Sequence, residues 1–251
     1  MQKYFISHEN LEALVIDGDD AFHITKVMRS RIGDEILVSD QNKTYLASIK
    51  SFDSNKVTFE IIEEKTGNME LPVFVSIFQG YPKGDKLDNI IKHGTELGVY
   101  EFYPTLMKRS VFKLEEKKKE SKLARFNKIA KEASEQSYRT YIPKVVDIIE
   151  LKKIDFSKFD YKIYCYEESA KECENSNFKN IISSLKSNDK IAIIIGPEGG
   201  IDSTEVEYLN KLGFIPCALG PRILRTETAV FYCMSAISYE MELIKWKKLV
   251  L

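Results

Sequence analysis

The stretch IIIGPEGG at residues 193–200 decides the fold of this chain. It ends the apolar run IAIII at 191–195, which lacks polar alternation and is typical of a strand buried on both faces of a parallel sheet. The glycines that follow let the backbone approach a ligand closely. Because open α/β sheets bind ligands at the carboxyl ends of their strands, the loop 196–200 is predicted to face a ligand.

A helix start follows this loop. Asp202 is a good N-cap residue, and Glu205 three positions later resembles its partner in a capping box. The free N–H groups at such a helix start can hold an anion. Taken alone, the loop is equally consistent with a tight strand-to-helix turn, and it matches neither the Walker A motif nor the dinucleotide fingerprint.

A second loop of the same kind is LGPRILRTETA at 219–229, after the short apolar run FIPCAL. Thr226 opens a final helix that we expect to run to about Lys247. Ile223 and Leu224 would be exposed in an ordinary loop, whereas they suit the walls around a flat apolar group such as an adenine. Two such strand ends in one α/β domain can line one cleft.

The rest of the chain divides into two predicted domains. Residues 1–70 contain short runs of alternating residues at a spacing of roughly ten, with turn formers between them, which favours a small β-barrel. From residue 73 onward strand and helix patterns alternate, which is typical of a parallel sheet with helices on both faces. We therefore predict an α/β protein with a β domain at 1–70 and an α/β domain at 73–251.

The overall composition is that of a globular protein. The chain has 251 residues, 43% hydrophobic residues and a net charge of −1, so it has no global basic signature of a nucleic-acid binder. Neither a signal peptide nor a membrane-spanning run is evident, and we expect a cytoplasmic protein. The four cysteines form no C-x-x-C pair, so no metal site is predicted.

Positive charge is concentrated in two places. Between residues 105 and 131 ten Lys and Arg residues, among them Lys108 and Arg109, stand against three Glu. In the first domain Lys26, Arg29 and Arg31 lie close together in sequence. Each cluster is consistent with a solvated surface or with a track for the phosphates of a nucleic acid.

These motifs carry a resemblance to a known family. IIIGPEGG and LGPRILRTETA resemble the knotted α/β methyltransferases, and the chain is similar almost end to end to the ribosomal RNA small subunit methyltransferase E family. The resemblance extends to three further segments: FHITKVMRSRIGDEI at 22–36, KGDKLDNIIKHGTELGV at 83–99, and KIAKEASEQSYRTYIPKV at 128–145, which carries the pattern E-Q-x-x-R-x-x-x-P.

The resemblance implies the fold, the cofactor and the reaction. It implies a PUA-like RNA-binding barrel followed by a trefoil-knotted parallel-sheet domain, a homodimer with the last helix in or near the interface, and S-adenosylmethionine held by the knot loops. The implied reaction is methylation of N3 of a uridine in 16S ribosomal RNA. The implied cofactor-binding residues are Tyr166, Gly196, Pro197, Glu198, Gly199, Gly200, Leu219, Gly220, Ile223, Leu224 and Thr226. The expected RNA-binding residues are His23, Lys26, Arg29, Arg31, Lys108 and Arg109.

The chemistry indicates candidate catalytic residues. A methyl group on a sulfonium is already a strong electrophile, so the reaction needs no metal. Uridine N3 is a weak acid, and a cation near the uracil oxygens would stabilise the anion formed when its proton leaves. Arg225, at the mouth of the predicted cleft, is one candidate, and a structural ion pair is its alternative role. Glu135 and Arg139 of the E-Q-x-x-R pattern are further candidates.

Two other functions remain open at this stage. A ribosome-assembly factor could keep the fold without turnover, although both glycine loops are intact here. A methyltransferase of ribose 2′-hydroxyls belongs to the same superfamily, but the predicted barrel at 1–70 fits the uridine-N3 family better.

Overall fold

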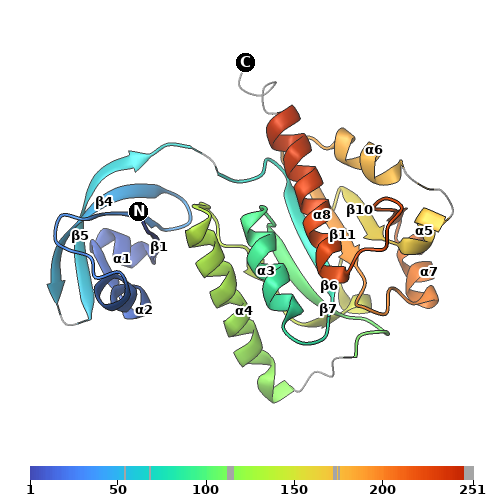
Figure 1. Cartoon of the computed structure of the whole chain (residues 1–251), viewed down its shortest axis with the longest axis horizontal. Helices are drawn as coiled ribbons and strands as arrows, with labels where there is room; N and C mark the ends of the chain where they lie inside the picture. Colours follow the sequence, from blue (N-terminus) through green and yellow to red (C-terminus); the bar gives the residue numbers. More distant parts are fainter. Residues whose placement is uncertain (54, 68, 112–115, 172–173, 175, 246–251) are drawn as a thin grey trace. The chain divides into compact units, whose positions relative to one another are not determined.

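The computed structural model describes residues 1–53, 55–67, 69–111, 116–171, 174 and 176–245 (Figure 1). Lys113 of the basic run, Cys173 and the predicted end of the final helix near Lys247 lie outside these ranges. The chain forms two compact units, Met1–Glu70 with Ser134–Ile142, and Leu71–Ala133 with Pro143–Leu251. The sequence placed residues 134–142 in the second domain, whereas their contacts place them in the first unit.

The first unit contains a five-stranded sheet in the order β1-β3-β4-β5-β2. β1 pairs with β3 in parallel, and the other neighbours are antiparallel. With β1 and β2 at its edges, the sheet is an open, curled half-barrel (Figure 1). The predicted small barrel is thus present in open form. Its strands are β1 Lys3–Phe5, β2 Val15–Asp17, β3 Glu35–Ser39, β4 Thr44–Asp53 and β5 Lys56–Lys65.

Short helices close the core of this unit. α1 (His8–Glu12), α2 (Gly18–Phe22) and the π-helix η1 (His23–Val27) carry Leu11, Ala21 and Ile24 into the apolar cluster on the concave side of the sheet. Directly after η1 the non-glycine residue Arg29 has a φ of 54°, which is uncommon and turns the chain sharply. Arg29 therefore marks a turn at the start of the exposed segment that follows η1.

The second unit is built on a parallel sheet in the order β12-β10-β11-β6-β7-β8, with β9 also paired to β7. β11 lies in the middle and all its residues after Lys190 are buried, as the run IAIII predicts. The strands are β6 Phe74–Gly80, β7 Glu101–Leu106, β8 Lys144–Val145, β9 Ile149–Glu150, β10 Tyr161–Cys165, β11 Lys190–Ile195 and β12 Ile215–Cys217.

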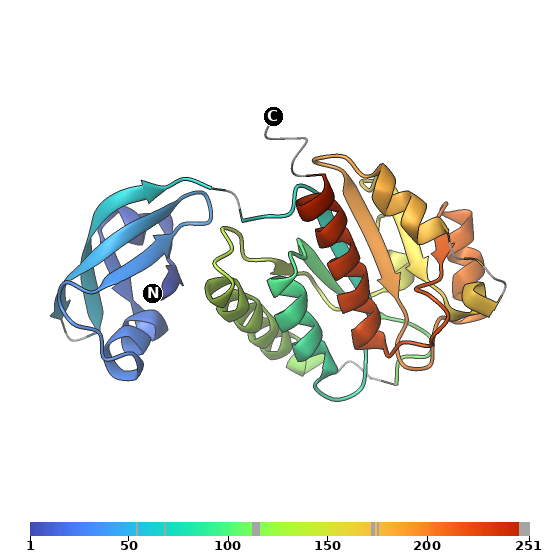
Figure 2. The same ribbon diagram turned by 45° about the horizontal axis from the view of Figure 1, so that its top comes forward.

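Helices and aromatic side chains cover the two faces of this sheet. α3 and α8 lie side by side on one face in both views (Figures 1 and 2). An aromatic cluster on the other face includes Phe78, Tyr103, Phe156 and Phe214. The helices are α3 Lys86–Glu96, α4 Glu116–Gln136, η2 Leu151–Lys153, α5 Glu167–Lys171, α6 Asn177–Ser184, α7 Ser203–Lys211, α8 Thr226–Ser238 and the π-helix η3 Tyr239–Ile244.

The elements that follow them set the ends of β10 and of the regular part of α8. β10 ends at Cys165, because Glu167 already begins α5. The final helix is regular only to Ser238 and continues as the π-helix η3. Among the described residues no helix is long and apolar enough to cross a membrane.

Candidate active site

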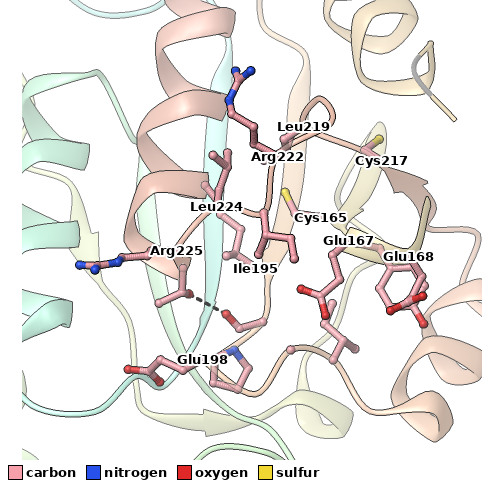
Figure 3. Close-up of a pocket in the computed structure, with 18 of the residues that line it drawn as sticks. Cys165, Glu167, Glu168, Ile195, Glu198, Cys217, Leu219, Arg222, Leu224 and Arg225 are labelled. Carbon is pink, nitrogen blue, oxygen red and sulfur yellow. Dashed lines mark hydrogen bonds between the residues drawn. The ribbon is translucent and has the colours of Figure 1, made fainter. Parts of the chain in front are cut away.

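A cavity of about 840 Å³ opens at the carboxyl ends of β10, β11 and β12 (Figure 3). The loops after these three strands line it, together with Lys86 from α3 and Arg109 from the loop after β7. Its volume falls in the range of small-molecule sites. The position agrees with the rule that parallel sheets bind ligands at their carboxyl edge.

The loop after β11 is held by very close backbone contacts. Gly200 donates from its N–H to the Pro197 carbonyl at 2.8 Å and has a φ of +72°. A Cβ atom on Gly196 would lie 2.9 Å from the Gly200 carbonyl carbon, and one on Gly80 would lie 2.5 Å from the Pro197 nitrogen. These distances are too short for any side chain, so this part of the loop requires glycine.

The helix start after this loop forms the predicted capping box. The Asp202 carboxylate accepts from the Thr204 N–H at 3.1 Å, and Glu205 accepts from the Asp202 N–H at 3.1 Å. Hydrogen bonds from Thr204 and then from Lys108 hold the pKa of Asp202 below its usual value. The buried Glu205 also accepts from the Lys108 N–H at 2.9 Å, so the cap joins the loop after β7 to α7.

The loop after β12 exposes apolar side chains toward the cavity. Ile223 is 77% exposed and Leu224 is half-buried, and both line the cavity. Gly220 has a φ of +95°, a conformation that favours glycine. The loop ends at Arg225, which caps α8 without a side-chain hydrogen bond. The apolar loop that the sequence identified therefore forms an accessible wall of the cavity.

A buried hydrogen-bond network connects these loops. The Thr226 hydroxyl donates to the Gly196 carbonyl at 2.6 Å, and Gln79 Nε2 donates to the Thr226 hydroxyl at 2.7 Å. Gln79 is a site residue that no sequence motif indicates. The only signal available was a polar residue at the end of the otherwise apolar run VFVSIFQ, which pattern analysis treats as a strand end.

Charged side chains occupy different sides of the cavity. Glu167 and Glu168 lie on one side, whereas the guanidinium groups of Arg222 and Arg225 extend away from them (Figure 3). Neither arginine makes an ion pair within the described ranges. Glu198 accepts from the Lys83 N–H at 3.1 Å and from Lys86 Nζ at 2.8 Å. Although partial burial opposes it, the Lys86 hydrogen bond holds the pKa of Glu198 below its usual value.

Comparison with known proteins assigns the chain. Residues 69–238 match the family model of an RNA methyltransferase domain, and residues 16–62 match that of an RNA methyltransferase PUA domain. Ribosomal RNA small subunit methyltransferase E of Bacillus subtilis is 44% identical over 98% of this chain and 99% of its own length. The chain belongs to the ribosomal RNA small subunit methyltransferase E family.

Solved structures agree with this assignment. A crystal structure of a hypothetical protein superposes with a TM-score of 0.88 at 42% identity, covering 97% of this chain and 100% of its own. The ribosomal RNA small subunit methyltransferase E of Neisseria gonorrhoeae, bound to S-adenosylmethionine, gives a TM-score of 0.80 at 27% identity, covering 95% of this chain and 97% of its own. The predicted α/β fold with a preceding PUA-like domain is confirmed.

The cavity brings together most of the residues that the family resemblance indicated. Of the predicted cofactor-binding residues all except Gly199 line it, and Arg225 does so as well. Gly199 is exposed and does not line the cavity, and its carbonyl accepts from Arg109 Nη1 at 2.9 Å. Their roles toward a ligand stay predictions.

The structure places Glu135 and Arg139 in the first unit and not in the cavity of the second. The Glu135 carboxylate accepts from the Phe5 N–H at 3.1 Å. The Arg139 side chain is 3% exposed and pairs with Glu70. Their catalytic role stays a prediction, which these contacts do not favour because they occupy the polar groups that a substrate would need.

The predicted RNA-binding residues fall into two groups. Lys26, Arg29 and Arg31 are exposed and make no ion pair with any residue that the structure describes. The His23 ring nitrogen Nδ1 lies 3.1 Å from the Tyr4 hydroxyl and joins η1 to β1.

The other two residues are Lys108 and Arg109 of the loop after β7, and Arg109 lines the cavity. Lys108 Nζ is 3.3 Å and Arg109 Nε is 3.7 Å from the Asp202 carboxylate. Both therefore neutralise a local acid, and both still keep about half of their side chains exposed.

Basic residues on α4 form ion pairs within the second unit. Lys119 pairs with Asp147 at 2.7 Å, and Arg125 forms an ion pair with Asp88 on α3. These pairs join α4 to its neighbours, so part of the run supports the fold.

Proposed function

We propose that this chain transfers the methyl group of S-adenosylmethionine to N3 of a uridine in the 16S ribosomal RNA of the small subunit. The cavity at 196–200 and 219–226 carries the proposal, because it combines glycine backbone with an exposed apolar wall at the carboxyl edge of the sheet. The relative from Neisseria gonorrhoeae, which binds S-adenosylmethionine, supports the choice of cofactor. The predicted knot of these loops is part of the same proposal.

The residues present fit this cofactor. Ile223 and Leu224 offer an apolar surface for the adenine, and the backbone at Gly196 and Gly220 approaches the cavity without side chains. The carboxylate of Glu167 complements a ligand that carries positive charge on its sulfur and amino groups. When bound, the cofactor supplies a methyl group on a positively charged sulfur, which is a strong electrophile.

Arg225 is the residue we assign to the substrate. Loss of the N3 proton places negative charge on the uracil oxygens, and an arginine aimed at them stabilises that charge. Arg225 is exposed at the cavity and makes no ion pair with the described residues, so its guanidinium is available to a base. The buried Arg139 lacks this availability.

The segment after α2 supports RNA binding by the first unit. Lys26, Arg29 and Arg31 alternate with exposed apolar side chains, including those of Phe22 and Ile32. Cations neutralise phosphates, and apolar side chains stack on unpaired bases. The combination favours an RNA that presents unpaired bases next to its backbone.

A homodimer is also part of the proposal. The side chains of Tyr232, Tyr239, Leu243 and Ile244 are exposed on α8 and η3, whereas Val230, Met234, Ile237 and Met241 of the same elements are buried. Such a stripe on the last helix is typical of an interface. We infer that it covers the same element of a second copy.

The test uses small subunits from a strain that lacks the modification. They are incubated with the protein and labelled S-adenosylmethionine, and the digested nucleosides are identified by mass spectrometry. Label in 3-methyluridine is the expected result. Label on a ribose 2′-oxygen would instead indicate the other methyltransferase class. Subunit binding without transfer, and without cofactor binding in calorimetry, would indicate an assembly factor.

A further inference from the structure

Gln79 is a buried polar residue with a directional set of hydrogen bonds. It lies near the end of β6, is 1% exposed, and does not line the cavity. Its Nε2 donates to the Gly80 carbonyl at 2.8 Å and to the Thr226 hydroxyl at 2.7 Å. Its Oε1 accepts no hydrogen bond from the described residues. The side chain thus acts through its two N–H groups alone.

The direction of these bonds fixes the hydrogen of Thr226. Because the amide nitrogen can only donate, the hydroxyl accepts from Gln79 and directs its own hydrogen to the Gly196 carbonyl, 2.6 Å away. Gln79 Nε2 also reaches the Gly196 carbonyl at 3.5 Å. Gly196 begins the loop after β11, and Thr226 begins α8, so one amide joins the two loops that line the cavity.

Backbone packing makes this junction rigid. Gly80, next to Gln79, approaches Pro197 so closely that no Cβ atom fits between them. On the outer side the Lys83 N–H donates to Glu198. The segment 79–86 therefore contacts the loop after β11 at three successive places. These contacts give a structural role to the start of the KGDKLDNIIKHGTELGV motif and to the residues just before it.

We propose that Gln79 is a positioning residue for methyl transfer, which holds the Gly196 carbonyl and the start of α8 in the arrangement that binds S-adenosylmethionine. The inference rests on the proposed function. It assigns the role to the donor groups of Gln79, which act through the Thr226 hydroxyl and make no contact with the cofactor. Glutamate is a poor replacement, because its ionised carboxylate would take the Thr226 hydrogen away from Gly196.

The test measures cofactor affinity and thermal unfolding of the full chain as separate quantities. Gln79→Met keeps the size of the side chain and removes both donors, and Thr226→Val removes the hydroxyl from the other end. We expect each change to weaken S-adenosylmethionine binding about tenfold in calorimetry. Substitutions within one hydrogen-bond network do not have additive effects. The Kd of the double variant for S-adenosylmethionine should therefore lie within about threefold of the Kd of the single variant that binds more weakly. Thr226→Ser should retain more affinity than Thr226→Val.

The outcomes separate this inference from the proposed function. Unchanged affinity in Gln79→Met, with normal binding by the wild-type chain, would overturn the inference alone. A hundredfold loss in the double variant would also overturn it, because independent effects multiply. If Gln79→Met does not fold, the cofactor affinities of Gln79→Glu, Thr226→Val and Thr226→Ser test the same hydrogen-bond network. Absence of binding by the wild-type chain would overturn both proposals.

Discussion

The buried Arg139 guanidinium and the half-buried Glu70 carboxylate form an ion pair that closes the first unit. Arg139 Nε lies 3.0 Å from Glu70 Oε2, and Glu70 Oε1 accepts from the N–H groups of Thr140 at 2.9 Å and Tyr141 at 3.1 Å. Glu70 is the last residue of the first segment of this unit. One carboxylate thus holds the returning segment 134–142 on the half-barrel.

Loss of this pair should destabilise the first unit. Arg139→Met removes the buried partner of Glu70, whose side chain is 19% exposed. The loss should therefore reach at most about 3 kcal/mol, the cost of breaking a fully buried ion pair. The measurement is urea unfolding of the full chain, followed by hydrogen exchange at Thr140 and Tyr141. Arg125→Met is the matched control, because Arg125 is about half exposed and pairs with Asp88, whose side chain is as exposed as that of Glu70. A smaller loss for Arg139→Met than for this control would contradict the prediction.

Substitution of Arg225 should affect catalysis and leave the stability of the chain nearly unchanged, in contrast to substitution of Arg139. Because Arg225 is exposed and makes no ion pair among the described residues, Arg225→Ala should leave the melting temperature within about one degree. It should lower kcat by about 10²- to 10³-fold, the effect of removing one group that stabilises negative charge in a transition state. Affinity for S-adenosylmethionine, measured by calorimetry, should change little. If Arg225→Ala kept the wild-type kcat, Arg225 would have no catalytic role.

The sequence predicts the elements of this site better than it predicts its connections. The buried strand 191–195, the two glycine loops and the Asp202 capping box are encoded locally, by apolar runs, turn residues and helix caps. The bond between Gln79 and Thr226 spans 147 positions and leaves no local pattern. The return of residues 134–142 to the first unit is equally invisible, because it depends on Glu70.

Lys3 should make the stability of the chain depend on pH. Burial lowers the pKa of its ammonium from 10.5 to about 8, although Glu70 and Glu135 oppose the shift. Between these two values the unfolded chain holds a proton that the folded chain has released, so the free energy of unfolding rises with pH. Subtracting the curve of Lys3→Met from that of the wild-type chain isolates this rise. A difference that is flat between pH 8 and 10 would show that Lys3 titrates normally.

The cluster of Lys26, Arg29 and Arg31 should determine the salt dependence of RNA binding. Replacing all three with Gln removes three cations that neutralise phosphates of an unpaired strand. The slope of log Kd against log salt concentration should therefore become shallower by roughly 2, since each phosphate of a single strand contributes about 0.7. A matched variant with Gln at Lys152, Lys186 and Lys211, which are also exposed, should keep the wild-type slope. Equal slopes for the two variants would place the RNA elsewhere.

The apolar stripe on the last helix should control the oligomeric state. Tyr232, Tyr239 and Leu243 follow one another at intervals of seven and four residues, which places them along one side of α8 and η3, and Tyr239 and Leu243 are 58% and 67% exposed. A glutamate in a self-complementary interface meets its own copy and repels it. Leu243→Glu should therefore sediment as a monomer at concentrations where the wild-type chain sediments as a dimer.

The control for this experiment is Ile62→Glu, because Ile62 is an exposed apolar residue on β5 of the other unit. It should sediment as the wild-type chain does. The melting temperature of a dimer depends on protein concentration, whereas that of a monomer does not, so the wild-type value should rise with concentration and that of Leu243→Glu should stay constant. A monomeric wild-type chain, or a dimer that survives Leu243→Glu, would mean that the stripe has another partner.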